Sequence, residues 1–102
     1  MAQVNWTIQA LADIEYIAEY ISLRSERYAA IHVKRLIDKT LILEKFPLTG
    51  AIVPELGDAA IRELSLGYYR IIYKVVDQDR IDILTVHHYR QLLSNNPMFW
   101  SE

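Results

Sequence analysis

The sequence contains no cysteine, only three glycines and only three prolines among its 102 residues. Without cysteine, neither a disulfide framework nor a thiolate metal site can form, so packing alone must stabilise the fold. No apolar run approaches the roughly 20 residues that a transmembrane helix needs, and the first residues lack the basic stretch and apolar core of a signal peptide. We therefore expect a cytoplasmic protein with no membrane segment and no cofactor.

The chain also lacks an excess of basic residues, since eleven Lys and Arg side chains stand against thirteen Asp and Glu side chains, for a net charge of −2. Proteins that gain affinity from phosphate contacts usually carry a basic surplus. A broad nucleic-acid footprint is therefore disfavoured, although a local basic patch is still compatible with this charge.

Length and composition predict one folded domain over residues 1–102. Hydrophobic residues make up 52% of the chain, which is well within the globular range. Two domains in a chain of this length would each be too short to bury a useful core.

Two amphipathic helices are predicted in the first half of the chain. Thr7 can cap a helix whose apolar residues recur every three or four positions from Ile8, and which ends near Leu23. Ser25 can cap a second helix, which Pro47 stops because the residue before a proline avoids helical backbone angles. The short link between the two helices predicts an antiparallel hairpin.

Alternating apolar and polar residues predict strands in the rest of the chain. The predicted strands cover residues 2–6, 60–64, 68–76 and 80–86. Turn-forming residues separate the last three strands, which should form an antiparallel meander. The predicted fold class is therefore α+β in the order β-α-α-β-β-β, with the helical hairpin packed on one face of a small, mainly antiparallel sheet.

The register of the meander predicts which side chains share a face. With residues 78–79 at the centre of the turn, Arg70 lies opposite His87. The same register pairs Tyr73 with Leu84. The face toward the helices then carries Tyr69, Ile71, Tyr73, Val75, Leu84 and Val86. The opposite, more polar face carries Tyr68, Arg70, Ile72, Lys74, Ile83, Thr85 and His87.

Several stretches, taken in order, resemble the recurring pattern of the RelE/ParE toxin superfamily. These stretches are Trp6, Ala12-Asp13-Ile14, Tyr20-Ile21, Pro47-Leu48-Thr49-Gly50, Val53-Pro54-Glu55, Arg62-Glu63-Leu64, residues 69–75 and residues 83–87. The resemblance covers residues 3–90, and it depends on the order and spacing of the stretches rather than on any single one. It implies the toxin component of a bacterial type II toxin–antitoxin, plasmid-stabilisation system.

The resemblance implies one of two mechanisms. ParE-like members inhibit DNA gyrase and are not known to need a catalytic set, whereas RelE-like members are ribonucleases that cut messenger RNA, often on the ribosome. Both are neutralised by an antitoxin, so the expected partner is a cognate antitoxin in a hetero-oligomer. The acidic balance, and the lack of any basic residue between positions 47 and 61, favour the ParE-like mechanism. An inactive member that only binds its antitoxin is a third alternative.

The RelE-like alternative names a candidate catalytic set. Its members are Arg70, His87, Tyr89 and Arg90. Arg70 aligns with the arginine that contacts the scissile phosphate in RelE-like nucleases, and its guanidinium is always protonated and can bind two oxygens. His87 can transfer a proton near neutral pH. In the structural alternative, Arg70 forms a cross-strand ion pair with Glu63, which a turn centred on residues 66–67 places opposite it, and His87 supports the fold.

Aromatic and basic residues predict a partner-binding surface. The predicted residues are Tyr16, Tyr20, Arg62, Arg70, Phe99 and Trp100. Tyr16 and Tyr20 lie four positions apart on the first helix, beside its main apolar line, and exposed aromatic residues of this kind often mark interfaces. The alternative for Arg62 is an ion pair with Glu63 at the edge of the sheet. The alternative for the aromatic C-terminal tail is that it folds back over the sheet.

The three histidines do not predict a metal site. His87 and His88 are adjacent in a strand, so their side chains point to opposite faces and cannot bind one metal ion together. His88 is expected at the edge of the core. His32 has no spaced histidine or carboxylate cluster around it in the sequence and is expected on the surface.

Overall fold

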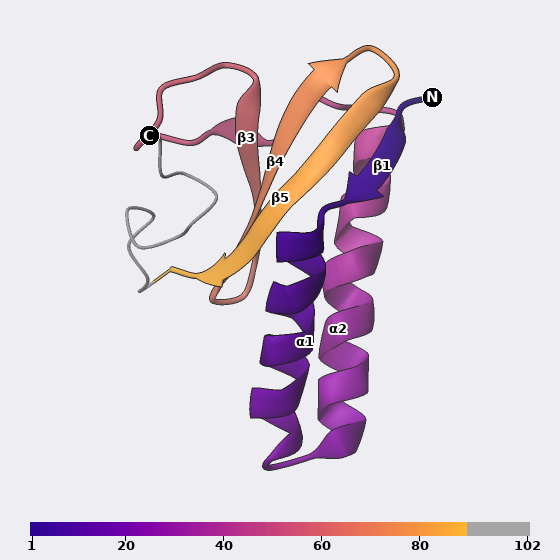
Figure 1. Ribbon diagram of the computed structural model, residues 1–102, viewed down its shortest axis with the longest axis vertical. Coiled ribbons are helices and arrows are strands. Elements are labelled where there is room, and N and C mark those ends of the chain that lie inside the picture. Colours follow the sequence, from indigo (N-terminus) through magenta and orange to yellow (C-terminus); the bar gives the residue numbers. More distant parts are fainter. Residues whose placement is uncertain (90–102) are drawn as a thin grey trace.

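The computed structural model describes residues 1–89 and shows a helical hairpin on one face of a five-stranded sheet (Figure 1). The helices are α1 (Ile8–Ser22) and α2 (Glu26–Lys39), followed by the short 3-10 helix η1 (Thr40–Glu44). The strands are β1 (Gln3–Trp6), β2 (Ala51–Ile52), β3 (Ile61–Leu66), β4 (Tyr69–Asp77) and β5 (Arg80–His88). The predicted α+β class is confirmed.

The strands lie in the order β1-β5-β4-β3-β2. The meander β3–β4–β5 is antiparallel, as predicted, and β1 pairs in parallel with β5 at the edge of the sheet. The strand β2 was not predicted, because its two residues are too few to show an alternating pattern. It pairs with the middle of β3, where Ala51 lies opposite Glu63 and Ile52 opposite Arg62.

A side-chain hydroxyl caps the N-terminus of each helix, as the sequence predicts. The Oγ1 atom of Thr7 accepts a hydrogen bond from the Ala10 backbone N–H, and the Oγ of Ser25 accepts one from the Tyr28 N–H. Thr7 also donates from Oγ1 to the Ile83 carbonyl at 2.7 Å, so the start of α1 is tied to β5. In Figure 1 the two helices run side by side, and the turn between them projects beyond the sheet.

The second helix ends earlier than Pro47. The α-helical part stops at Lys39, and the chain continues as η1 for five residues. Thr40 is buried, and its hydroxyl donates to the Ile37 carbonyl at 2.7 Å. Such a bond to the preceding turn competes with the regular helical pattern and favours the tighter 3-10 geometry.

The main core lies between the hairpin and the sheet. Its fully buried members include Ala10, Leu36, Leu43, Ile71, Tyr73, Ile81 and Ile83. The hydroxyl of Tyr73 reaches the segment before β2, where it donates to the Pro47 carbonyl at 2.7 Å and accepts from the Gly50 N–H at 3.0 Å. A side chain at position 50 would collide with this ring, because an added Cβ would lie 2.6 Å from the Tyr73 hydroxyl.

The predicted register between β4 and β5 is confirmed over the first half of their pairing. Arg70 lies opposite His87. Beyond Ile72 a bulge shifts the pairing, so that Tyr73 lies opposite Ile83 rather than Leu84. The prediction for Leu84 and Ile83 was therefore wrong, because one extra residue in a strand reverses which side chains face the core.

The structure places these two side chains on exchanged faces. Ile83 is fully buried beneath the helices. Leu84 instead packs with Val53 and Ile72 on the other face of the sheet, where a second, smaller apolar cluster forms. Val53 begins the segment between β2 and β3, which we call the β2–β3 loop (residues 53–60), and its burial holds this loop against the sheet.

The turn between β3 and β4 also differs from the prediction. Ser65, rather than Glu63, lies opposite Arg70, because the pairing is displaced by two residues. Gly67 adopts a φ of 58° in this turn, a conformation that glycine accepts without strain. A displacement of two residues keeps every side chain on its face, so Glu63 still shares a face with Arg70.

Candidate functional site

Arg70 is the centre of a charged cluster on the sheet face that points away from the helices. Its Nη1 and Nη2 donate to the two carboxylate oxygens of Glu55 at 2.7 Å and 3.0 Å. Its Nε donates to Oε2 of Glu63 at 2.9 Å, and Nη2 also binds that oxygen. The predicted ion pair with Glu63 is confirmed, and Glu55 from the β2–β3 loop adds a second carboxylate.

The electrostatics of this cluster favour ionised side chains. The hydrogen bond from Arg70 lowers the pKa of Glu55, and the bonds to Glu55 and Glu63 raise the pKa of Arg70. One cation between two carboxylates leaves a net negative charge. Four of the five N–H donors of the guanidinium bind these carboxylates, so a phosphate would have to displace them.

His87 lies opposite Arg70 and is buried, with 4% of the residue exposed. Neither ring nitrogen has a hydrogen-bond partner among residues 1–89. Burial is the main cause that lowers the pKa of His87, and the charge of Arg70 lowers it further. The ring is therefore neutral near pH 7 and is held within the fold. Its predicted role in proton transfer stays a prediction.

Tyr89 completes the part of the candidate catalytic set that the structure describes. Its ring lies 5.6 Å from the Cζ atom of Arg70, and its hydroxyl is hydrogen-bonded to the Ser65 hydroxyl. The structure thus brings Arg70, His87 and Tyr89 together. Arg90, the fourth predicted residue, lies outside the described residues.

The Arg62 side chain donates hydrogen bonds to backbone carbonyls before and after β2. Its Nε donates to the Ala59 carbonyl at 3.0 Å, and its Nη1 donates to the carbonyls of Leu48 and Gly50 at 3.3 Å and 3.0 Å. The ion pair with Glu63 that was the alternative for Arg62 does not form, because Glu63 binds Arg70. The predicted partner contact of Arg62 stays a prediction.

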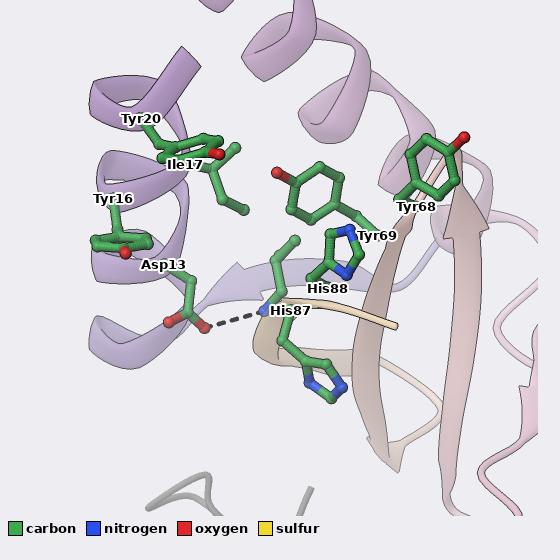
Figure 2. Close-up of a pocket in the computed structure, with 9 residues that line it drawn as sticks. Asp13, Tyr16, Ile17, Tyr20, Tyr68, Tyr69, His87 and His88 are labelled. Atoms are coloured by element: carbon green, nitrogen blue, oxygen red, sulfur yellow. Dashed lines mark hydrogen bonds between the residues drawn. The ribbon is translucent and has the colours of Figure 1, made fainter. Parts of the chain in front are cut away.

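A pocket of about 340 Å³ opens between α1 and the paired ends of β4 and β5 (Figure 2). We call it the tyrosine pocket, because it is lined by Tyr16, Tyr20, Tyr68 and Tyr69, together with Asp13, Ile17, Val86, His87 and His88. Tyr16 and Tyr20, two of the predicted partner-binding residues, are 69% and 65% exposed. Figure 2 shows their rings on α1 and the Tyr69 ring on the sheet side, while the His87 imidazole points away from them.

A row of aromatic rings joins α2 to this pocket, and the sequence did not predict it. The rings follow one another in the order Tyr28, His32, Tyr69, His88 and Tyr68, with centroids 5.3 to 6.1 Å apart. The prediction that His32 lies on the surface was wrong, since it is half-buried between Tyr28 and Tyr69, and burial lowers its pKa. The four-residue spacing of Tyr28 and His32 is the one sequence signal that could have indicated the contact.

Within residues 1–89, no group of three or more histidine or carboxylate side chains could hold a metal ion. The predicted partner-binding residues Phe99 and Trp100 lie outside the described residues. In the part of the chain that the structure covers, no helix is long and apolar enough to cross a membrane.

A hairpin of two helices on a sheet with this strand order defines a ParE-like toxin fold. A solved structure of the chromosomal ParDE toxin–antitoxin system from P. aeruginosa superimposes with a TM-score of 0.71, covering 86% of this chain and 96% of that chain at 24% identity. At that identity the likeness shows the fold. The sequence model of the family described as the ParE toxin of the type II toxin–antitoxin system parDE matches residues 4–93. The chain therefore belongs to the ParE toxin family. No curated protein sequence matches it.

Proposed function

We propose that this toxin acts in the bacterial cytoplasm by binding and inhibiting DNA gyrase, and that a cognate antitoxin neutralises it. Membership of the ParE toxin family supports a type II toxin. The hydrogen bonding of Arg70 is the observation that favours gyrase over messenger RNA as the target. The arginine that a RelE-like nuclease would aim at the scissile phosphate is bound here by Glu55 and Glu63.

The charges around Arg70 oppose phosphate binding. A phosphate that approached the guanidinium would meet two carboxylates, and replacing either of them would separate an ion pair in which only 6% of the Arg70 side chain is exposed. The cost is largest for Glu63, whose side chain is 14% exposed, and smaller for Glu55, whose side chain is 45% exposed. The β2–β3 loop supplies Glu55 and Asp58 and no basic residue that could compensate.

One observation favours the ribonuclease alternative. Arg70, His87 and Tyr89 lie next to one another, as the residues of a nuclease site would. Cleavage would require Glu55 to leave the guanidinium, and the Glu55 side chain is 45% exposed at the edge of the cluster. Replacing Glu55 by glutamine would then weaken its hold on Arg70 and raise the rate of RNA cleavage.

The experiment is controlled expression of the toxin in a bacterium without the antitoxin, combined with a supercoiling assay on purified gyrase. Wild type, Glu55→Gln and Arg70→Ala are compared for growth, transcript integrity and DNA-damage response, after circular dichroism has shown which variants fold. We expect filamentation, a damage response, intact transcripts and inhibited supercoiling for wild type and Glu55→Gln.

Other outcomes would contradict the proposal. Cut transcripts that increase with Glu55→Gln and disappear with Arg70→Ala would identify a ribonuclease. Harmless expression, together with unaffected supercoiling at a large excess of folded toxin, would identify an inactive member that only binds its antitoxin.

A further inference from the structure

The tyrosine pocket combines an apolar floor with aromatic walls. Ile17 of α1 and Val86 of β5 are 5% and 2% exposed and form its base. Above them, Tyr16 and Tyr20 rise from α1 and Tyr69 from the start of β4, so rings stand on both sides (Figure 2). Such a pocket can enclose a long, partly apolar side chain.

Among residues 1–89, the pocket is lined by the carboxylate of Asp13 and by no lysine or arginine. The whole of α1 carries Asp13, Glu15 and Glu19 and no basic residue. Asp13 is the charged α1 side chain that lines the pocket, and Glu15 and Glu19 lie elsewhere around the helix. A phosphate or carboxylate ligand would be repelled here, whereas a cation would be attracted.

Asp13 is held in place and can still accept a further hydrogen bond. Its Oδ2 accepts from the Val86 N–H at 3.0 Å and from the Thr85 hydroxyl, which fastens α1 to β5. Its Oδ1 accepts from the Gln9 amide at 2.8 Å. An ionised carboxylate has about four acceptor positions. Three bonds therefore leave Asp13 able to accept one from a cationic ligand.

Tyrosine ring faces also attract cations. The attraction strengthens where water is excluded from the contact. Arginine and lysine join a cation to a methylene stem, and the stem would pack on Ile17 while the cation meets ring faces and Asp13. Both parts of the pocket are then used by one side chain.

We propose that the tyrosine pocket receives an arginine or lysine side chain from a segment of the cognate antitoxin. The inference rests on the proposed function in one respect, that an antitoxin binds this toxin. Asp13 and the tyrosine rings around it select a cationic side chain of that partner. Tyr16, Tyr20 and Tyr68 are 69%, 65% and 74% exposed, and burial of tyrosine rings around one anchoring side chain is typical of the centre of a protein–protein interface.

The chemistry of the pocket is tested first without any partner. N-acetyl-arginine amide and its neutral counterpart N-acetyl-citrulline amide are titrated into the 15N-labelled full-length toxin, and amide chemical shifts are followed by NMR. We expect the arginine probe to shift the resonances of pocket residues and to bind at least about fivefold more tightly than citrulline. Equal binding of the two probes, or no binding at the pocket, would overturn the proposal.

The occupant is tested with the purified cognate antitoxin by isothermal titration calorimetry. Tyr20→Leu removes a ring face and keeps apolar surface, Tyr20→Phe keeps the ring, and Tyr28→Leu changes an exposed tyrosine of α2 that does not line the pocket. We expect at least tenfold weaker binding for Tyr20→Leu and nearly unchanged binding for the other two. One Lys→Gln or Arg→Gln change in the antitoxin should show no additional loss when combined with Tyr20→Leu.

The remaining outcomes separate the two proposals. Full antitoxin affinity in Tyr20→Leu would overturn the assignment of the pocket to the antitoxin, and so would a variant that loses gyrase inhibition instead. If the wild-type toxin does not bind the antitoxin at all, neutralisation fails as part of the proposed function. The arginine probe then still decides whether the pocket takes a cation.

Discussion

Arg70 carries its charge at a position where only 5% of the residue is exposed. It remains ionised there because Glu55 and Glu63 accept its hydrogen bonds, and the Tyr89 ring lies within cation–π distance of it. The two carboxylates are not equivalent. The Glu63 side chain is 14% exposed and the Glu55 side chain 45% exposed, so water can replace the lost contacts of Glu55 more readily.

This difference predicts unequal costs for two matched substitutions. Glu63→Gln removes the more buried carboxylate and should lower the free energy of unfolding by about 2 to 3 kcal/mol. Glu55→Gln should cost about 1 kcal/mol or less, because a half-exposed pair is screened by solvent. Urea unfolding at neutral pH measures both. A larger loss for Glu55→Gln would show that the β2–β3 loop, rather than the strand pairing, holds Arg70.

The lowered pKa of His87 predicts how the stability of the protein depends on pH. Its folded-state pKa lies below the unfolded value of 6.5, mainly because of burial and then because of Arg70, while Asp13, Glu55 and Glu63 act in the opposite direction. As pH falls, the unfolded chain therefore binds the proton first. The contribution of His87 to stability is complete above pH 6.5 and is lost as pH falls through the folded-state pKa.

Thermal unfolding from about pH 7.5 to about pH 5 measures this dependence. We expect wild type to lose stability over the range and His87→Gln to show a flatter profile. His32, whose pKa is also lowered, contributes with the same sign, so His32→Gln serves as the control that should remove a separate part of the slope. Glu55 titrates below this range, because its pKa is lowered from 4.5. An unchanged slope in His87→Gln would contradict the assignment.

At the scale of elements, the two helix-capping residues make different sets of hydrogen bonds. Ser25 accepts one hydrogen bond from the first turn of α2, on an exposed surface. Thr7 accepts the corresponding bond in α1 and also donates to the Ile83 carbonyl, so it joins α1 to β5. A cap residue therefore fixes the position of the hairpin on the sheet as well as the start of a helix.

Alanine substitutions should reveal that difference. Ser25→Ala should destabilise the protein by about 1 kcal/mol, which is the usual cost of losing a cap. Thr7→Ala should cost about 2 kcal/mol, since the buried Ile83 carbonyl also loses a partner. Ser22→Ala, which removes an exposed bond to the Glu19 carbonyl, is the control and should change stability little. Chemical denaturation measures all three, and equal costs at positions 7 and 25 would contradict a joining role.

The positions of the strands were largely predictable from the sequence, but their register was predictable only in part. The alternating pattern located four of the five strands and the pairing of Arg70 with His87, because side chains alternate along any strand. It misplaced Leu84 and Ile83, since both are apolar and nothing in the local pattern marks the bulge after Ile72. The position of the bulge depends on how distant segments pack on the two faces of the sheet, as Val53 packs against Ile72.

At the scale of the whole molecule, the distribution of charge argues against a nucleic-acid surface. The chain has a net charge of −2. Among its arginines, Arg70 and Arg80 form ion pairs, and Arg62 binds backbone carbonyls. The three arginines of the described sheet are thus bound within the molecule.

This distribution predicts weak RNA binding. Filter binding of a single-stranded RNA at about 150 mM salt should show no measurable affinity at micromolar toxin, and any binding at low salt should disappear as salt is raised. The variant Glu55→Gln, which loses an acidic charge beside Arg70, is the comparison and should bind only slightly better. Tight binding by wild type that survives at 150 mM salt would contradict the proposed target.

The amino-acid sequence by itself determined the α+β class, the hairpin, the meander and the family resemblance, because these follow from local periodicity, caps and the order of short motifs. It also brought Arg70 and His87 together through one turn. Only the tertiary structure decided that Glu55 closes over Arg70, and that Tyr16, Tyr20 and Tyr69 enclose a pocket. These contacts join segments far apart in the chain, and their geometry depends on how the β2–β3 loop and α1 pack against the sheet, which no local pattern encodes.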